Sequence, residues 1–226
     1  MVVPPRLTRA TLSSAVSELA ARDAGLARIV ATHGPPPLWA RPHGFETLVR
    51  IILEQQVSLK SAATLSKRVA LGLDGITPAS VLHAGVDGLR GHGLTRQKAA
   101  YVVALAERVE SGALPLRALS KHDDTSVATL LKSVPGIGPW SASIYQLMVL
   151  RRPDIWPPGD LALHKALQRL HELPTMPSSD AATRLAERWA PWRAVAARIL
   201  WQGYLEEQRL GRSHVRISSE PHPCPA

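Results

Sequence analysis

The spacing of apolar residues constrains the fold of this chain most strongly, because it has a helical period almost throughout. Phe45, Leu48, Val49, Ile52 and Leu53 fall at positions i, i+3, i+4, i+7 and i+8, which places them along one face of a helix. No stretch shows sustained period-two alternation of β-branched or aromatic residues. We therefore predict an all-α protein of about ten to twelve helices with short connections.

Glycine and proline residues divide the helical stretches into short elements, because clusters of these residues end helices and form turns. The clusters lie at residues 33–37, 72–75, 91–93, 134–139 and 151–159. The last segment, residues 211–226, lacks apolar periodicity and contains three prolines. We predict a flexible tail there.

The balance of charge indicates an acidic partner. The chain of 226 residues carries 27 Lys and Arg against 18 Asp and Glu, which gives a formal net charge of +9 with histidine neutral. Only six of the basic residues are lysines, and the guanidinium group of arginine suits bidentate contacts with phosphate. An arginine-rich codon usage would give the same composition, so the charge alone does not decide the partner.

A single cysteine and the lack of long apolar runs exclude several classes of protein. Cys224 alone cannot form an intrachain disulfide, a four-thiolate zinc site or a four-cysteine iron–sulfur cluster. Residues 1–12 lack the apolar core of a signal peptide, and no run approaches the ~18 apolar residues of a membrane span. The nine histidines have no zinc-site spacing, and no glycine loop for a nucleotide cofactor occurs. We expect a soluble cytoplasmic protein that needs no cofactor and contacts no membrane.

The segment from residue 124 to residue 148 carries the most specific signal. Asp124 or Thr125 can cap a helix that ends at a tight turn, in which Gly136 and Gly138 stand one residue apart. Both glycines can adopt a positive φ and let another molecule approach the backbone. Pro139 suits the first position of the next helix, whose free N–H groups would point outward. This geometry suits a phosphate oxygen.

Five segments, in order along the chain, resemble motifs of the helix-hairpin-helix superfamily of base-excision DNA glycosylases. The sequence LKSVPGIGPWSA at residues 131–142 resembles the hairpin. The other segments are ILEQQVS at 52–58, GLTRQKA at 93–99, PPGDLAL at 157–163 and ERWAPWR at 187–193. The resemblance is closest to the 3-methyladenine DNA glycosylase II family. Larger members carry an N-terminal β-rich domain, for which we expect no room in this chain.

This resemblance implies two α-helical subdomains with the site in the cleft between them. We expect residues 41–164 to form the central bundle, with the hairpin at 125–148, and residues 1–40 and 165–210 to form the other subdomain. The implied activity is hydrolysis of the N-glycosidic bond of alkylated bases, such as 3-methyladenine or 7-methylguanine, flipped out of duplex DNA. The product would be an abasic site. The protein would act as a monomer in base excision repair, and would associate with the nucleoid if it is bacterial.

Asp160 is the residue to which the resemblance assigns catalysis. It follows a Pro-Pro-Gly turn at the start of an amphipathic helix, where aspartate is also a common N-cap worth ~1 kcal/mol. An ionised carboxylate near the sugar would stabilise an oxocarbenium-like transition state and orient the attacking water. Both roles can hold at once.

Three aromatic residues are candidates for the base pocket. Trp140 and Trp201 match pocket positions of the family, and an electron-poor alkylated base stacks well on an indole. Tyr145 could also reach the pocket, although the aromatic position of the family aligns with Ile144. Core packing is the alternative for such residues. Relatives that also cut the strand carry a lysine nucleophile at the position of Trp140, so we expect a monofunctional enzyme with no lyase activity.

The resemblance also assigns contacts with the DNA helix. Gln56 would insert into the gap left by the extruded base, whereas Gln55 could cap its own helix. Gly136, Gly138 and Lys132 would contact the DNA backbone.

A monovalent cation, Na⁺ or K⁺, bridges the hairpin to a DNA phosphate in the family. Its ligands here would be the backbone carbonyls of Lys132, Val134 and Gly136. The family also includes members with an iron–sulfur cluster, which Cys224 alone could not hold.

Two other functions remain open at this point. A non-catalytic helix-hairpin-helix DNA-binding protein would carry the same hairpin, with Asp160 only as a helix cap. A glycosylase for other lesions, such as deaminated bases or bases methylated on the Watson–Crick face, would keep the same aspartate. Assays of base release distinguish these possibilities.

Overall fold

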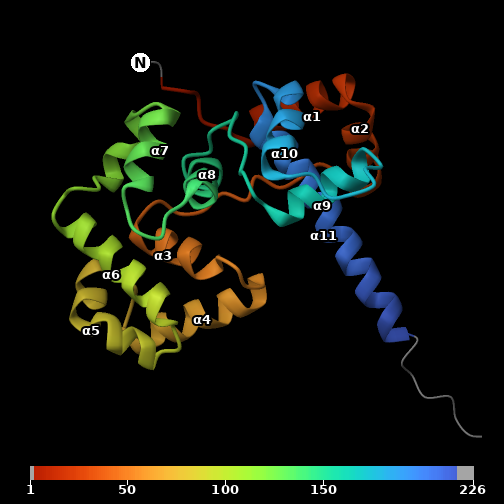
Figure 1. The fold of residues 1–226 in the computed structure, drawn as a ribbon. Helices are drawn as coiled ribbons and strands as arrows, with labels where there is room; N and C mark the ends of the chain where they lie inside the picture. Colours follow the sequence, from red (N-terminus) through yellow and green to blue (C-terminus); the bar gives the residue numbers. More distant parts are fainter. Residues whose placement is uncertain (1–2, 218–226) are drawn as a thin grey trace, which may run out of the picture. The chain divides into compact units, whose positions relative to one another are not determined.

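The structure is a computed structural model that describes residues 3–217, without the side chains of Leu59 and of residues 210–217. The described residues form eleven α-helices and two 3-10 helices and contain no strand (Figure 1). The all-α prediction is confirmed. Within this range, none of the helices has the length and apolar character needed to cross a membrane.

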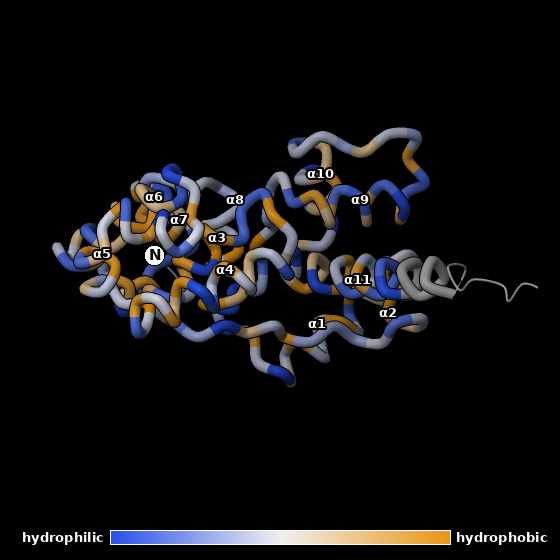
Figure 2. Tube along the Cα trace, turned by 90° about the horizontal axis from the view of Figure 1, so that it is seen from below, coloured by the Kyte–Doolittle hydropathy of each residue, from blue (hydrophilic) through white to orange (hydrophobic). Residues whose placement is uncertain are grey.

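The described chain divides into two compact units. Unit 1 contains the described residues up to Leu7 together with Trp39–Pro157, and unit 2 contains Thr8–Leu38 and the described residues from Pro158 onward. In the tube of Figure 2, apolar and polar positions alternate along the helices, as expected for helices with one buried face.

Unit 1 is built around one strongly apolar helix. Its elements are α3 (Phe45–Glu54), α4 (Leu59–Gly72), α5 (Pro78–Gly91), α6 (Arg96–Glu110), η1 (Leu116–Lys121), α7 (Asp124–Lys132) and α8 (Pro139–Met148). Helix α3 buries most of its residues, and α4, α6 and α8 pack against it. Helix α5 packs on α6, and α7 on α8. The apolar face that the sequence predicts on residues 45–53 therefore forms the centre of this unit.

Unit 2 is built around the N-terminal half of the last helix. Its elements are α1 (Arg9–Arg22), α2 (Ala24–His33), α9 (Leu161–Leu170), α10 (Ser179–Ala186), η2 (Glu187–Trp189) and α11 (Arg193–Ile217). Residues 194–200 of α11 are fully buried, and α1, α2 and α9 pack against this helix. Burial lowers the pKa of Arg198 to about 10, and its guanidinium donates hydrogen bonds to the carbonyls of Leu38 and Ala194.

Two predicted boundaries differ from the structure. Asp160 belongs to unit 2 rather than to the unit with the hairpin, because it caps α9, which packs on α11. The first residues belong to unit 1, where the N–H of Leu7 donates to the carbonyl of Arg151 at 2.8 Å.

The predicted tail begins too early. Helix α11 continues to Ile217, since all three prolines of the predicted tail come later and nothing in residues 211–217 interrupts a helix. The rest of the predicted tail, residues 218–226, lies outside the described residues. Helix α11 is therefore longer than predicted, and none of the candidate site residues lies in the added segment.

Candidate active site

The hairpin begins one residue earlier than predicted. Asp123, and not Asp124 or Thr125, caps α7: its carboxylate accepts hydrogen bonds from the backbone N–H of Ser126 at 3.0 Å and from the hydroxyl of Ser126 at 2.8 Å. These hydrogen bonds lower the pKa of Asp123. The cap supplies an acceptor for a backbone N–H at the start of α7 and so stabilises the first helix of the hairpin.

The two glycines of the hairpin turn have different roles. Gly136 has φ +83°, and a Cβ at this position would lie 2.2 Å from Cγ of Tyr101, so only glycine fits. Gly138 has φ −86° and an extended backbone, so the prediction of a positive φ is wrong there. A Cβ on Gly138 would meet no atom within 4 Å, which leaves the backbone on this side open to another molecule. Lys132, at the end of α7, is exposed.

Gln55 connects the end of α3 to the hairpin. Its side-chain amide Nε2 donates to the carbonyl of Gly136 at 2.7 Å and to Oγ of Ser141 at 2.9 Å. Gln55 is also the C-cap of α3, as predicted, but through its backbone N–H, which donates to the carbonyl of Ile52, while its side chain bonds to the hairpin. Because the two partners of this side chain are more than 80 residues away, no local sequence pattern indicates this contact.

Lys98, which lies on α6, donates hydrogen bonds to backbone carbonyls at the end of α3. Its ammonium Nζ donates to the carbonyls of Leu53 at 2.8 Å and Gln55 at 2.9 Å. Burial lowers the pKa of Lys98. A cation at the C-terminal end of a helix is also favoured by the helix dipole. The sequence analysis assigned no role to Lys98, whose one signal is its place in the GLTRQKA motif.

We expect the Lys98→Met variant to lower the free energy of unfolding by about 1.5–3 kcal/mol, because two carbonyls at the end of α3 lose a charged donor. Chemical denaturation measures this change. Lys67→Met is the matched control, since Lys67 is exposed on α4, and we expect a change within about 0.5 kcal/mol. Equal losses in the two variants would contradict the capping role.

Gln56 follows in an unusual backbone conformation. It has φ +57° and is exposed, so the turn after α3 presents this side chain to solvent. A left-handed conformation costs a non-glycine residue about 1–2 kcal/mol. Insertion of Gln56 into DNA stays a prediction, for which exposure is a requirement.

Two of the three carbonyls predicted to hold a cation, those of Val134 and Gly136, already accept hydrogen bonds. The carbonyl of Val134 accepts from the N–H of Ile137 at 3.1 Å, and that of Gly136 accepts from Gln55. A carbonyl oxygen has two lone pairs, so each keeps one for a cation. Neutral backbone oxygens suit Na⁺ or K⁺, and the residues therefore fit the predicted ion. Among the described residues, no group of three or more His, Cys, Asp or Glu side chains could hold a metal ion.

Asp160 and Trp201 meet inside unit 2. Asp160 is 9% exposed, and its Oδ1 accepts hydrogen bonds from the N–H of Leu163 at 3.0 Å and from the indole Nε1 of Trp201 at 3.2 Å. Asp160 is therefore both a helix cap and a buried carboxylate with a fixed orientation. The sequence predicts that Trp201 lines the base pocket. The hydrogen bond from Trp201 to Asp160 is a feature that the sequence did not indicate.

Trp140 and Tyr145 lie on α8 of unit 1. Trp140 is half-buried at the second position of the helix. Tyr145 is fully buried, its hydroxyl lies 3.4 Å from Nε2 of His43, and the two rings meet edge to face. Burial raises the pKa of Tyr145. Tyr145 therefore packs in the core of unit 1, and its predicted contact with a base has no support in this packing.

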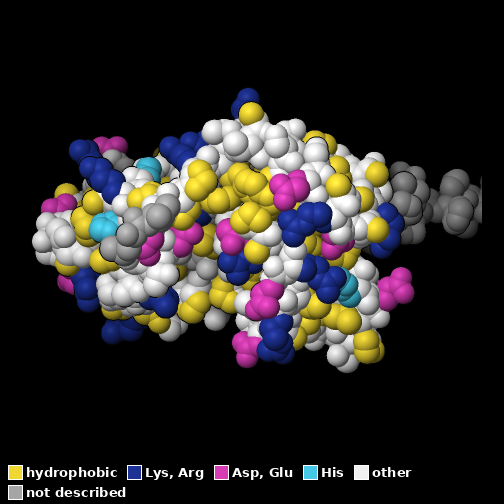
Figure 3. Space-filling view, turned by 90° about the horizontal axis from the view of Figure 1, so that it is seen from above, with side chains coloured by type: hydrophobic (Ala, Val, Ile, Leu, Met, Phe, Trp, Pro, Cys, Tyr) yellow, Lys and Arg dark blue, Asp and Glu magenta, His cyan; other side chains and the backbone are white. Residues whose placement is uncertain are grey.

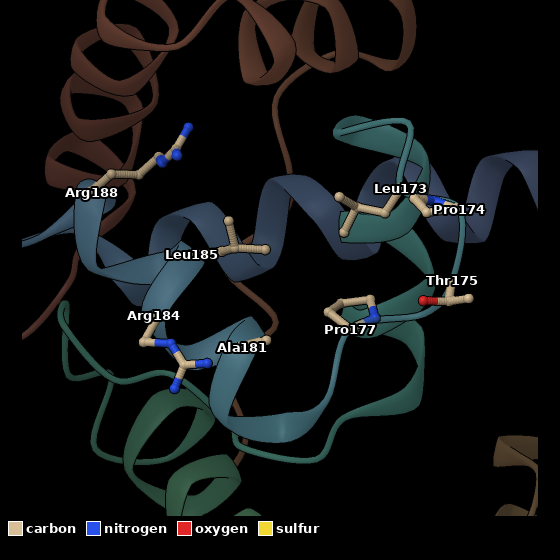
Figure 4. A pocket seen from close by; sticks show the side chains of 8 residues that line it. All are labelled: Leu173, Pro174, Thr175, Pro177, Ala181, Arg184, Leu185 and Arg188. Atoms are coloured by element: carbon tan, nitrogen blue, oxygen red, sulfur yellow. The ribbon is translucent and has the colours of Figure 1, made fainter.

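A hollow in unit 2 lies away from the candidate site residues. It has a volume of about 430 Å³ and lies between the loop after α9 and helix α10, with Leu173, Pro177 and Leu185 along it and Arg184 and Arg188 at one end (Figure 4). None of the candidate site residues lines it. On the face shown in Figure 3, Lys and Arg side chains are interspersed with Asp and Glu side chains.

The helical fold and the α7–α8 hairpin define a helix-hairpin-helix protein. Residues 49–191, which include both the hairpin and Asp160, match the HhH-GPD superfamily of base excision DNA repair proteins. The chain therefore belongs to this superfamily.

Individual relatives support the assignment. The chain is 26% identical over 185 residues to YfjP of Bacillus subtilis, a match that covers 78% of this chain and 64% of that protein. It is 31% identical over 168 residues to DNA-3-methyladenine glycosylase 2 of Escherichia coli, which covers 70% of this chain and 56% of that protein. The chain thus spans less than two thirds of these two relatives.

A solved structure covers more of both chains. The Schizosaccharomyces pombe 3-methyladenine DNA glycosylase Mag1 in complex with abasic DNA has a TM-score of 0.75 and 26% identity. The similarity covers 84% of this chain and 95% of Mag1.

Proposed function

We propose that this protein is a monofunctional DNA glycosylase that removes alkylated bases, of the 3-methyladenine or 7-methylguanine type, from duplex DNA. The observation that carries the proposal is the buried carboxylate of Asp160, held by two N–H donors at the start of α9, in a chain of a base excision repair superfamily. The E. coli relative is named for release of 3-methyladenine, and the Mag1 complex contains abasic DNA. An abasic site is the product that this reaction leaves.

Asp160 would act on the sugar of the flipped nucleotide. As the bond from C1′ to the base nitrogen breaks, its electron pair leaves with the base and positive charge develops on the sugar. The ionised carboxylate of Asp160 stabilises this charge and orients the water that bonds to C1′ and releases a proton. A cationic alkylated base is a good leaving group, so little acid catalysis is needed.

The aromatic residues would select the base. The indole of Trp140 would stack on an electron-poor base, and so would the face of Trp201, whose N–H edge is bonded to Asp160. Tryptophan has no nucleophile for a Schiff base, so the reaction ends at the abasic site without strand cleavage.

The DNA-binding surface would lie on the hairpin and the turn after α3. The open side of Gly138 and the exposed Lys132 would meet phosphates, Gln56 would fill the gap in the base stack, and Na⁺ or K⁺ at the hairpin carbonyls would neutralise a phosphate. We propose that the protein acts as a monomer in the cytoplasm, with double-stranded DNA as its partner.

Base release from a panel of duplexes, each with one lesion, tests the proposal. We expect release of free alkylated base, an alkali-sensitive abasic site, and no protein–DNA adduct after borohydride treatment. Binding of duplex DNA without release from any lesion would instead indicate a non-catalytic helix-hairpin-helix protein. Release of deaminated bases alone would change the substrate class, and a trapped adduct would contradict the monofunctional assignment.

A further inference from the structure

His164 is a buried histidine that the proposed mechanism does not use. It lies on α9 four residues after Asp160, so the two residues share one face of the helix. The side chain is 7% exposed, and its Nε2 has no hydrogen-bond partner in the described structure. Buried polar atoms in proteins nearly always have a partner, so each exception needs an explanation, and beside a candidate catalytic carboxylate a bound substrate can supply the partner.

The surroundings of His164 hold the imidazole neutral. Burial lowers its pKa, and the negative charge of Asp160 opposes this shift without reversing it. The other charged residues on α9, on α10 and on the part of α11 with described side chains are Lys165, Arg169, Asp180, Arg184, Arg193, Arg198, Glu206, Glu207 and Arg209. Of all these groups only Asp160 contributes to the pKa of His164. Asp160 is thus the charged group that acts on the imidazole of His164.

We propose that His164 is a further substrate-contacting residue of the Asp160 site, and that its Nε2 donates a hydrogen bond to an oxygen of the flipped-out nucleotide. Sugar and phosphate oxygens are the acceptors that a neutral imidazole N–H would meet there. The neutral ring leaves the charge of Asp160 intact. A protonated ring would pair with Asp160 and weaken its stabilisation of the cationic sugar. This inference rests on the proposed function.

His171 provides a matched control on the same helix. It is the C-cap residue of α9, its Nε2 is also buried without a hydrogen-bond partner, and burial also lowers its pKa. It differs in lying eleven residues from Asp160, about 16 Å along a helix. A purely structural effect of a buried histidine should therefore appear at both positions.

The test compares His164→Leu, His164→Gln and His171→Leu with the wild type by single-turnover base release from about pH 5 to about pH 8. We expect His164→Leu to lower the rate at neutral pH by about 3- to 10-fold, the value of one neutral hydrogen bond. Thermal stability should stay equal or rise in both leucine variants, since each loses a buried unpartnered nitrogen. The wild type and His171→Leu should lose activity on acidification as His164 gains a proton. His164→Gln, which cannot gain one, should have a flatter profile.

Equal rates and equal pH profiles for the His164 and His171 variants would overturn the inference. A second measurement separates this outcome from failure of the proposed function. Imidazole nitrogen NMR with a duplex that contains an abasic-site analogue should shift the signals of His164 and not those of His171. A shift without base release from any lesion would retain the contact and reject the glycosylase, whereas base release with unshifted His164 signals would reject the contact alone.

Discussion

The Asp160→Asn variant is expected to lose base release by about 10²- to 10³-fold, because the neutral amide no longer stabilises the positive charge that develops on the sugar. Asparagine caps helices about as well as aspartate, and its oxygen can still accept from the N–H of Leu163 and the indole of Trp201. Stability and affinity for duplex DNA should therefore stay close to wild type. Single-turnover assays on methylated duplex, with thermal unfolding in parallel, measure the two effects separately.

Asp160→Ala separates charge from capping. It removes both functions of the side chain, so we expect the same loss of rate and an additional loss of about 1 kcal/mol in the free energy of unfolding. If Asp160→Asn releases bases as fast as the wild type, the residue is a helix cap alone and the proposed mechanism is wrong.

The Gly136→Ala variant is expected to lower the free energy of unfolding by about 3 kcal/mol. The new Cβ would lie within 2.2–2.8 Å of Tyr101, and the residue would also have to keep φ +83°. Because Gln55 bonds to the carbonyl of Gly136, a shift of this residue would also displace the turn after α3. Chemical denaturation gives the stability change, and binding of duplex DNA should weaken in the same variant.

Gly138→Ala is the paired experiment. The backbone there suits any residue and the Cβ would face open space, so stability should change by less than about 0.5 kcal/mol. Weaker binding of DNA in a stable Gly138→Ala protein would place the phosphate contact at this residue. Equal destabilisation of the two variants would contradict the different roles that the structure gives to the glycines.

Local patterns predicted the helices and the hairpin because both depend on residues close in sequence. The face of residues 45–53, the hairpin turn and the cap role of Asp160 follow from spacing and from the chemistry of proline, glycine and aspartate. The family resemblance assigned catalysis to Asp160. The assignment of a positive φ to Gly138 failed because two nearby glycines look alike in sequence, whereas the structure gives them φ angles of opposite sign and packs Tyr101 against Gly136 alone.

Contacts between distant segments could not be predicted in the same way. The bond between Trp201 and Asp160 joins residues 41 apart, and the bonds of Gln55 join two elements more than 80 residues apart. Each of these hydrogen bonds depends on how the helices pack. Apolar spacing predicts which face of a helix is buried, but not which helix packs against that face. The burial of Tyr145 and the position of Asp160 in unit 2 are consequences of the same packing.

The hydrogen bonds of Gln55 and Lys98 connect two loops that are far apart in sequence. Lys98 bonds to the last turn of α3, and Gln55 joins this turn to the hairpin, so the turn that carries Gln56 and the open backbone at Gly138 belong to one hydrogen-bonded frame. If the hairpin binds a phosphate as proposed, this frame would present Gln56 at a constant offset along the strand. The proposed insertion of Gln56 would then test successive base steps with the same side chain, and sensitivity to a weakened base pair would come from the DNA rather than from rearrangement of the protein.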